Sequence, residues 1–93
     1  SLAIELGPHD ITVNAILPGI VESRRVAEVL ASKARLQGVT EDALRAEVLE
    51  HVALNRMVPM AHIADTALFL ASPAGRSITG QNMNVCAGVR ALR

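Results

Sequence analysis

The sequence predicts an α/β fold in which helices join two parallel strands, and three observations predict it. A β-branched run over 11–17 ends at Pro18-Gly19, and a second short run with alternating apolar residues spans 81–86. Between them the apolar residues recur with helical spacing, most clearly over 60–71. A strand–helix–strand order of this length indicates a right-handed crossover between parallel strands. Because parallel strands are normally covered on both faces within a larger sheet, two of them alone are expected to be incomplete.

Composition excludes several classes of protein. The chain has 93 residues, of which 51% are hydrophobic, so a packed core is expected rather than disorder. Formal net charge is zero and Phe69 is the one aromatic residue, which argues against a nucleic-acid partner because neither a basic surface nor stacking platforms are present. No apolar run approaches the roughly 20 residues that span a bilayer, so no membrane association is expected. With Cys86 as the single cysteine, no internal disulfide is possible, and a cytoplasmic location is expected.

The first ten residues are predicted to be the end of a helix. Leu2, Ala3 and Leu6 supply its apolar side, and Gly7-Pro8 is expected to stop it, with Gly7 as the residue after the helix. Residues 11–23 then form the first strand and the loop that follows it.

Residues 24–54 are predicted to form two helices. Ser23 and Thr40 are the residue types that cap helix N-termini, and Gly38 is suited to end the first helix. Glu41 and Arg45 have the spacing of an i, i+4 ion pair.

Residues 59–72 are predicted to form a packing helix, and residues 81–86 the last strand. The helix is expected to bury a stripe of apolar residues spaced three or four apart: Met60, Ile63, Ala64, Ala67, Leu68 and Ala71.

No residue of this chain is assigned a catalytic or metal-ligating role. The three histidines, His9, His51 and His62, are widely separated and lack metal-ligand spacing. Glu47 and Glu50 are expected on a solvated helix face, and Cys86 is expected to be a small buried apolar residue.

Three segments in series resemble the short-chain dehydrogenase/reductase family. They are Ser1 to Pro8 followed by Ile11 to Gly19, then Ile63 to Pro73, and then Ile78 to Val85. The resemblance implies a Rossmann-type doubly wound parallel sheet. Residues 1–93 would be the C-terminal segment of that single domain and would supply its last two strands, with lid and packing helices.

The resemblance also implies an activity: an NAD(P)-dependent oxidoreductase that moves hydride between nicotinamide and a small-molecule carbonyl or alcohol substrate. In the family pattern the catalytic Ser, Tyr and Lys and the glycine-rich phosphate loop lie upstream of these segments, and this chain has no Tyr. The 93 residues alone are therefore expected to be inactive. The choice between NAD and NADP is read near the second strand of such sheets and stays open. A non-catalytic truncated module that assembles with other chains is the alternative.

The resemblance places the loop after the first strand against the nicotinamide. Dinucleotides bind beyond the carboxyl ends of parallel strands. Gly19 would permit a close backbone approach, backbone groups near Val21 would pair with the carboxamide, and the Ser23 hydroxyl would reach the carboxamide or a phosphate oxygen, where the family more often has Thr. An ordinary strand-ending Pro-Gly turn is the alternative. The candidate cofactor-binding residues are Pro18, Gly19, Ile20, Val21 and Ser23.

The resemblance identifies residues 24–54 as the family's variable substrate lid. Periodicity alone leaves open whether its apolar residues (Val26, Val29, Leu30 and Leu36) line a substrate wall or pack on the protein body. Arg24-Arg25 would hold an anion or form a solvated pair, of which the solvated pair is favoured. Residues 85–88 read Val-Cys-Ala-Gly where the family usually has Val-Asp-Gly-Gly, a stretch that lies at subunit interfaces in relatives. A homo-oligomer is expected.

Overall fold

Two parallel strands form the centre of the molecule. The structure, a computed structural model, describes residues 1–89. Strand β1 (Ala15–Pro18) pairs with β4 (Asn82–Val85) in parallel, in a register that runs from Ala15 opposite Asn82 to Pro18 opposite Val85. The α/β class and the parallel pairing predicted from the sequence are thereby confirmed.

A second, shorter parallel pair joins β2 (Val21–Glu22) to β3 (Val58–Pro59). Residues 23–57, which include two helices, connect these two short strands. The four α-helices of the described residues are α1 (Leu2–Leu6), α2 (Arg24–Gln37), α3 (Glu41–Leu49) and α4 (Met60–Ala71), and 3₁₀ turns follow at Gly7–His9 and Pro73–Gly75.

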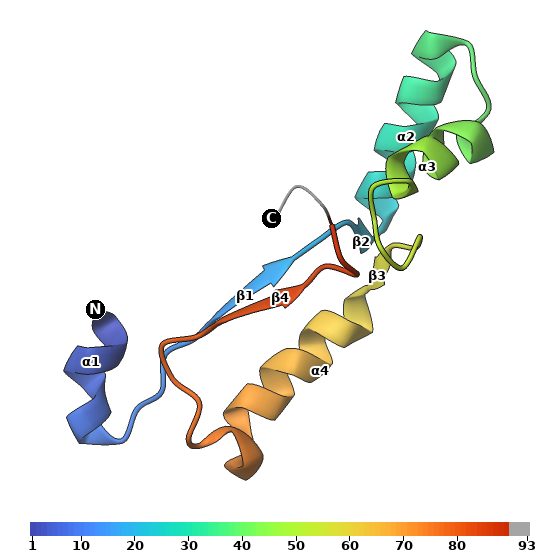
Figure 1. Cartoon of the computed structure of the whole chain (residues 1–93). Coiled ribbons are helices and arrows are strands. Elements are labelled where there is room, and N and C mark those ends of the chain that lie inside the picture. Colours follow the sequence, from blue (N-terminus) through green and yellow to red (C-terminus); the bar gives the residue numbers. More distant parts are fainter. Residues whose placement is uncertain (90–93) are drawn as a thin grey trace.

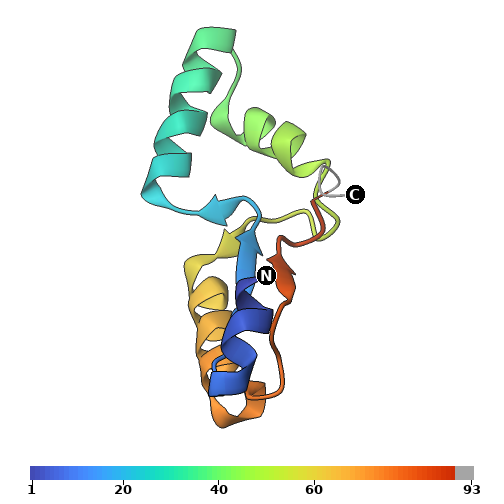
Figure 2. The same ribbon diagram turned by 90° about the vertical axis from the view of Figure 1, so that its left-hand side faces the viewer.

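The described chain is elongated. Its extents are 57 × 24 × 20 Å and its radius of gyration is 17.1 Å, against about 12 Å for a compact domain of this length. The α2–α3 hairpin lies at one end of the long axis and α1 at the other, with the β1–β4 pair and α4 between them (Figure 1). Seen from the side, the hairpin extends away from the sheet (Figure 2). Such a shape leaves the sheet region largely uncovered.

Burial is concentrated at the hairpin end. The buried hydrophobic residues all come from the hairpin or from the segment that returns from it to the sheet: Leu30, Ala34, Leu44, Val52, Met57 and Val58. Leu30, Ala34, Leu44 and Met57 form one cluster, against which Ile20 packs from the outgoing side. In helices α1 and α4 no residue is buried.

The first strand is shorter than the 11–17 predicted from sequence, because hydrogen bonds of side chains, and not only of the backbone, hold its first half. Along 13–15 the chain runs beside 79–81, where the Val13 N–H donates to the Thr79 hydroxyl at 3.0 Å. The Asn14 side chain donates to the Ile78 carbonyl at 2.9 Å and accepts from the Gln81 N–H at 3.1 Å. Side-chain oxygens and nitrogens thus replace part of a backbone ladder, and the regular strand begins only at Ala15.

Two local predictions at the helices were wrong. Gly7 has φ −53° and continues the right-handed turn, whereas Asp10 (φ 60°) takes the left-handed position, because the chain tightens into a 3₁₀ turn after α1 instead of stopping. Arg45 lies near the Met57 sulfur at 3.7 Å rather than pairing with Glu41. The ion pair found among residues 1–89 is Arg24–Glu28, at 3.4 Å.

The predicted stripe of α4 was wrong except at Ile63. The other five predicted positions are exposed, whereas the half-buried positions are Ile63, Thr66 and Leu70, which follow the helical spacing i, i+3, i+7. Helix α4 lies alongside the β1–β4 pair and contacts β1 (Figure 1).

Candidate functional site

The loop that leaves β1 lies at the carboxyl end of the parallel pair. Pro18 is the last residue of β1, exposed and opposite Val85, and the chain turns at Gly19 and Ile20 into β2. In parallel α/β sheets this edge is where ligands bind. The structure brings Pro18, Gly19, Ile20, Val21 and Ser23 together there, at the base of the α2–α3 hairpin.

Gly19 is required for packing within the chain. Its N–H donates to the Val85 carbonyl at 3.0 Å. A Cβ built on Gly19 would lie 2.7 Å from the Cys86 Cα and 2.9 Å from its carbonyl oxygen. The close approach that this glycine permits is therefore to the end of β4, a constraint that the sequence interpretation did not include.

The backbone polar groups of Ile20 and Val21 point in opposite directions, the Ile20 carbonyl toward β3 and those of Val21 away from it. The Ile20 carbonyl accepts from the Val58 N–H at 2.8 Å, and its side chain packs on the hairpin cluster. Val21 pairs with Val58 in the short parallel ladder, where the bonds of Val58 go to the residues flanking Val21. The N–H and C=O of Val21 itself consequently point to the strand edge away from β3.

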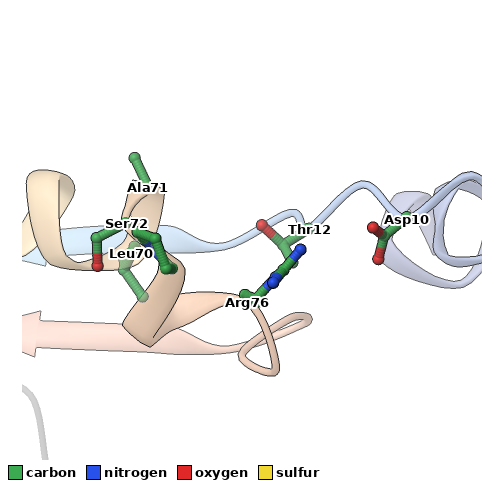
Figure 3. Close-up of a pocket in the computed structure, with 7 residues that line it drawn as sticks. Asp10, Thr12, Leu70, Ala71, Ser72 and Arg76 are labelled. Carbon is green, nitrogen blue, oxygen red and sulfur yellow. The ribbon is translucent and has the colours of Figure 1, made fainter.

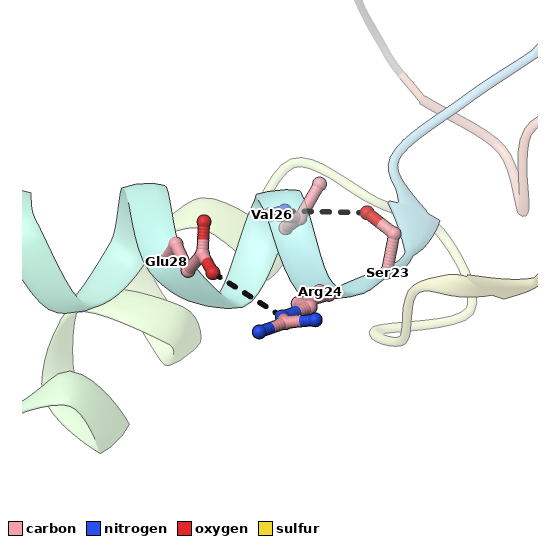
Figure 4. A network of polar contacts seen from close by, with 4 residues as sticks. All are labelled: Ser23, Arg24, Val26 and Glu28. Carbon is pink, nitrogen blue, oxygen red and sulfur yellow. Dashed lines mark hydrogen bonds and ion pairs between the residues drawn. The ribbon is translucent and has the colours of Figure 1, made fainter.

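Ser23 is the N-cap of α2. The Val26 N–H donates to the Ser23 Oγ at 3.2 Å, and Arg24, the next residue, pairs with Glu28 one turn further along α2 (Figure 4). A serine hydroxyl has two acceptor lone pairs and one donor hydrogen, so accepting this bond leaves the O–H free to donate elsewhere. The cap predicted from sequence is confirmed, and it fixes where the hydroxyl sits.

The structure separates the apolar residues of α2 into two groups. Leu30 is buried in the cluster with Ala34 and Leu44, and Val26 packs against it. Val29 and Leu36 are exposed. Of the four residues left open by periodicity, Leu30 and Val26 stabilise the hairpin itself, and Val29 and Leu36 are the ones free to face a ligand.

The arginine pair at the start of α2 is solvated. The side chain of Arg24 is 93% exposed and pairs with Glu28, and Arg25 is exposed. The favoured interpretation of this pair as a surface feature agrees with these positions, and the Arg24–Glu28 contact is a normal i, i+4 pair.

A hollow of about 390 Å³ lies at the opposite end of the sheet. Asp10 and Thr12, which precede β1, line it together with Ser72 and Arg76 beyond the end of α4 (Figure 3). Dinucleotides bind beyond the carboxyl ends of parallel strands, whereas this hollow lies at their amino ends and is therefore at the wrong end of the sheet for the cofactor.

Other features of residues 1–89 concern metal ligands, the single cysteine and membrane spans. Within this range no three histidine, cysteine, aspartate or glutamate side chains come together as a potential metal site. Cys86 is a free, half-buried thiol. None of the helices described has both the length and the apolar character needed to cross a bilayer.

Two features at the carboxyl edge were missed by sequence reasoning. One is the packing of Gly19 on Cys86, and the other is the contact of Gly88 with Ala53, where an added Cβ would lie 2.4 Å from the Ala53 Cβ. The signal for the second was the glycine in the short segment after the last strand, but its partner is 35 positions away and only the fold reveals it.

Comparison with known proteins identifies the family. A family model described as enoyl-(acyl carrier protein) reductase matches residues 1–90. Short-chain reductase protein NovJ of Streptomyces niveus is 38% identical over 88 residues, which are 95% of this chain and 32% of that protein. The chain belongs to the short-chain dehydrogenase/reductase family. It spans about a third of the length of the curated relatives that it matches.

Solved structures of this family confirm the Rossmann-type fold. A short-chain dehydrogenase family protein from Francisella tularensis superposes with a TM-score of 0.87 at 27% identity, covering 97% of this chain and 37% of that one. The actinorhodin polyketide ketoreductase with NADPH gives a TM-score of 0.81 at 31% identity, covering 95% and 34%. The short-chain dehydrogenase/reductase segment described here therefore corresponds to part of a larger sheet in its relatives.

Proposed function

We propose that this chain is the C-terminal part of an NAD(P)-dependent oxidoreductase that moves hydride between nicotinamide and a small-molecule carbonyl or alcohol substrate. Family membership supports the reaction class. Solved relatives in complex with NADPH and with NADH support the cofactor class, and both cofactors remain candidates. The nicotinamide supplies or accepts the hydride, and the residues of this chain orient it.

The observation that carries the proposal is the position of residues 18–23 at the carboxyl edge of a parallel pair. There the backbone N–H and C=O of Val21 point away from β3, which suits pairing with a carboxamide. The Ser23 hydroxyl keeps its hydrogen available while its oxygen caps α2. Gly19 and Ile20 hold the loop in place through the Val85 and Val58 bonds. The chain thus provides binding and orientation.

The acid/base step is outside the reach of these residues. The family's tyrosine does not occur among the 93 residues, which hold none. We therefore propose that these residues form the nicotinamide-binding side of the complete domain. The isolated chain is expected to have no oxidoreductase activity. If the reading frame that contains this chain encoded no Tyr-x-x-x-Lys motif and no glycine-rich first turn, the proposed reaction would be abandoned.

Substitutions of Ser23 separate a cofactor contact from a helix cap. Ser23→Ala removes both the hydroxyl donor and the cap, whose loss costs about 1 kcal/mol of stability. Ser23→Asp keeps a good N-cap and removes the donor, and Ser23→Thr keeps both. In the complete enzyme, titration with NADH and NADPH monitored by nicotinamide fluorescence is expected to show a several-fold weaker Kd for Ala and Asp and little change for Thr.

Thermal unfolding of the same three variants supplies the control. The Ala variant is expected to lose stability and the Asp variant to retain it, so weaker cofactor binding by the Asp variant cannot be explained by a disrupted helix. Unchanged cofactor affinity in both the Ala and the Asp variant would remove Ser23 from the site.

The second candidate is a non-catalytic module that assembles with other chains. One observation favours it: in the described residues β1 has a partner on one edge, and helices α1 and α4 bury no residue. Assembly into a homo-oligomer in the cytoplasm would fit either candidate. The intact mass of the purified protein distinguishes them, since a mass well above 9.8 kDa favours the oxidoreductase and a mass near it favours the module.

A further inference from the structure

We propose that residues 85–88, at the end of β4, form a strap that holds both connections of the α2–α3 hairpin and thereby fixes the hairpin against the sheet. The outgoing connection is residues 19–23 and the return connection is residues 50–59. The inference concerns conformation and stands independently of the proposed reaction.

The strap holds the outgoing connection through Gly19. The Gly19 N–H donates to the Val85 carbonyl at 3.0 Å. Gly19 also lies so close to Cys86 that an added Cβ would come within 2.9 Å of three Cys86 atoms, two of them backbone. The start of the outgoing connection is therefore fixed by one hydrogen bond and one close backbone contact.

The strap holds the return connection through a second pair of bonds. The Leu54 N–H donates to the Ala87 carbonyl at 3.0 Å, and the Ala53 N–H donates to the Gly88 carbonyl at 2.9 Å. Val52, which is buried, forms an antiparallel bridge with Val89 just beyond the strap. Two consecutive carbonyls of the strap thus accept hydrogen bonds from two consecutive amides of the return connection.

The backbone of the strap is adapted to this arrangement. Ala87 has φ 54° and Gly88 has φ 82°, so both are left-handed. That region is unfavourable for alanine and free for glycine. Residues in such conformations persist where surrounding contacts hold them, and here the contacts are those with Ala53 and Leu54.

The hairpin and its two connections pack together into one body. Ile20 and Met57, one from each connection, belong to the same apolar cluster as Leu30 and Leu44. The Val58 N–H donates to the Ile20 carbonyl at 2.8 Å, which ties the connections to each other. Besides the covalent path through Gly19 and Pro59, the strap thus provides a contact through which the sheet restrains this body.

Hydrogen exchange of the protein in its native assembly tests the strap. Gly88→Ala would place a methyl 2.4 Å from the Ala53 Cβ. The expected result is at least about tenfold faster exchange at the amides of Ala53 and Leu54. Exchange at Ala15 and Gly80 is expected to stay unchanged, because their bonds join the segments that lead into β1 and β4, at the far end of the strands from the strap.

Two further variants separate the contact from backbone strain. Gly38→Ala carries the same kind of strain, with φ 68°, but has no atom within 4 Å of the added Cβ; it is expected to leave Ala53 and Leu54 unaffected. In the double variant Gly88→Ala with Ala53→Gly, the nearest remaining atoms to the added methyl are the Ala53 N at 3.4 Å and Cα at 3.5 Å. Exchange is expected to return most of the way toward the unmodified rate.

Three results would overturn the strap: unchanged exchange at 53 and 54 in Gly88→Ala, no recovery in the double variant, or acceleration spread equally over β1 and β4. Should Gly88→Ala not fold, the unmodified protein still decides the matter. Its amides at Gly19, Ala53 and Leu54 are expected to share one protection level, and unprotected amides at Ala53 and Leu54 would refute the proposal.

Discussion

The two ends of the molecule are stabilised in different ways. In the hairpin region, residues 20–58, Leu30, Ala34, Leu44 and Met57 close a cluster of buried apolar side chains. In the sheet region, α1, β1, α4 and β4, the apolar side chains are half-buried or exposed, and the two chain segments leading into the strands are joined through Asn14 and Thr79.

This difference indicates which region depends on the rest of the fold. Burial of apolar surface is the main favourable term in folding, and the hairpin obtains it from its own residues. The whole chain covers 37% and 34% of two solved Rossmann-type relatives, and the parallel strands of its sheet region require cover on both faces. The candidate cofactor loop lies at the boundary between the two regions, held by both.

The largest effect is expected in the hairpin cluster. Leu44 is 4% exposed, so Leu44→Ala removes buried methyl groups and leaves a cavity, which should lower the free energy of unfolding by about 2–5 kcal/mol. Leu36→Ala, on the same hairpin but 88% exposed, is the matched control and should change it by less than about 0.5 kcal/mol. Urea denaturation measures both, and equal losses would break the contrast between the regions.

The boundary itself is probed by Gly19→Ala. The added methyl would meet the Cys86 backbone, which cannot yield as a flexible side chain would, so a loss of about 1–3 kcal/mol is expected. Gly7→Ala is the control, because its φ is −53° and no atom lies within 4 Å; it should be neutral or stabilise by about 0.4–1 kcal/mol. A tolerated Gly19→Ala, judged by thermal unfolding, would mean that the loop is not packed on β4.

The sheet region should respond to loss of a polar side chain. Asn14→Ala removes two hydrogen bonds to residues 78 and 81, at an expected cost of about 1–2 kcal/mol. Asn14→Asp keeps the acceptor for the Gln81 N–H and loses the donor, so a smaller loss is expected. Denaturation with a probe of the sheet measures this, and no loss in the Ala variant would show that Asn14 does not hold β1.

The smallest effect is expected at the surface of the hairpin. The Arg24–Glu28 pair is exposed on both sides, so Arg24→Ala should cost about 0.3–0.5 kcal/mol, and the difference should shrink further in high salt. Measuring the unfolding midpoint at low and high ionic strength checks this. A loss above 1 kcal/mol that persists in salt would point to a role for Arg24 other than its pair with Glu28.

Local chemistry in the sequence was sufficient to place the hairpin. The caps at Ser23 and Thr40 and the left-handed Gly38 depend on residues within four positions, and all three occur as predicted. The parallel pairing of β1 and β4 followed from the length of the connection, and the structure confirms it.

Predictions that depended on distant contacts were less successful. Helix α4 is apolar on most sides, so its periodicity does not show that, of the predicted stripe, Ile63 is half-buried while Met60 and Leu68 are exposed. The contact of Gly88 with Ala53 and that of Gly19 with Cys86 join residues far apart in the chain. No spacing rule reveals such pairs, because the fold brings them together.

The central claim is that residues 18–23 lie beside the nicotinamide, on a sheet completed from outside this chain. Hydrogen exchange of the native protein with and without NADH or NADPH tests it directly. The account predicts slower exchange with cofactor at the amides of Gly19 to Ser23 and no change at Ser72 to Arg76, which border the hollow at the other edge of the sheet. Unchanged exchange at 19–23, or protection at 72–76 in its place, would contradict it.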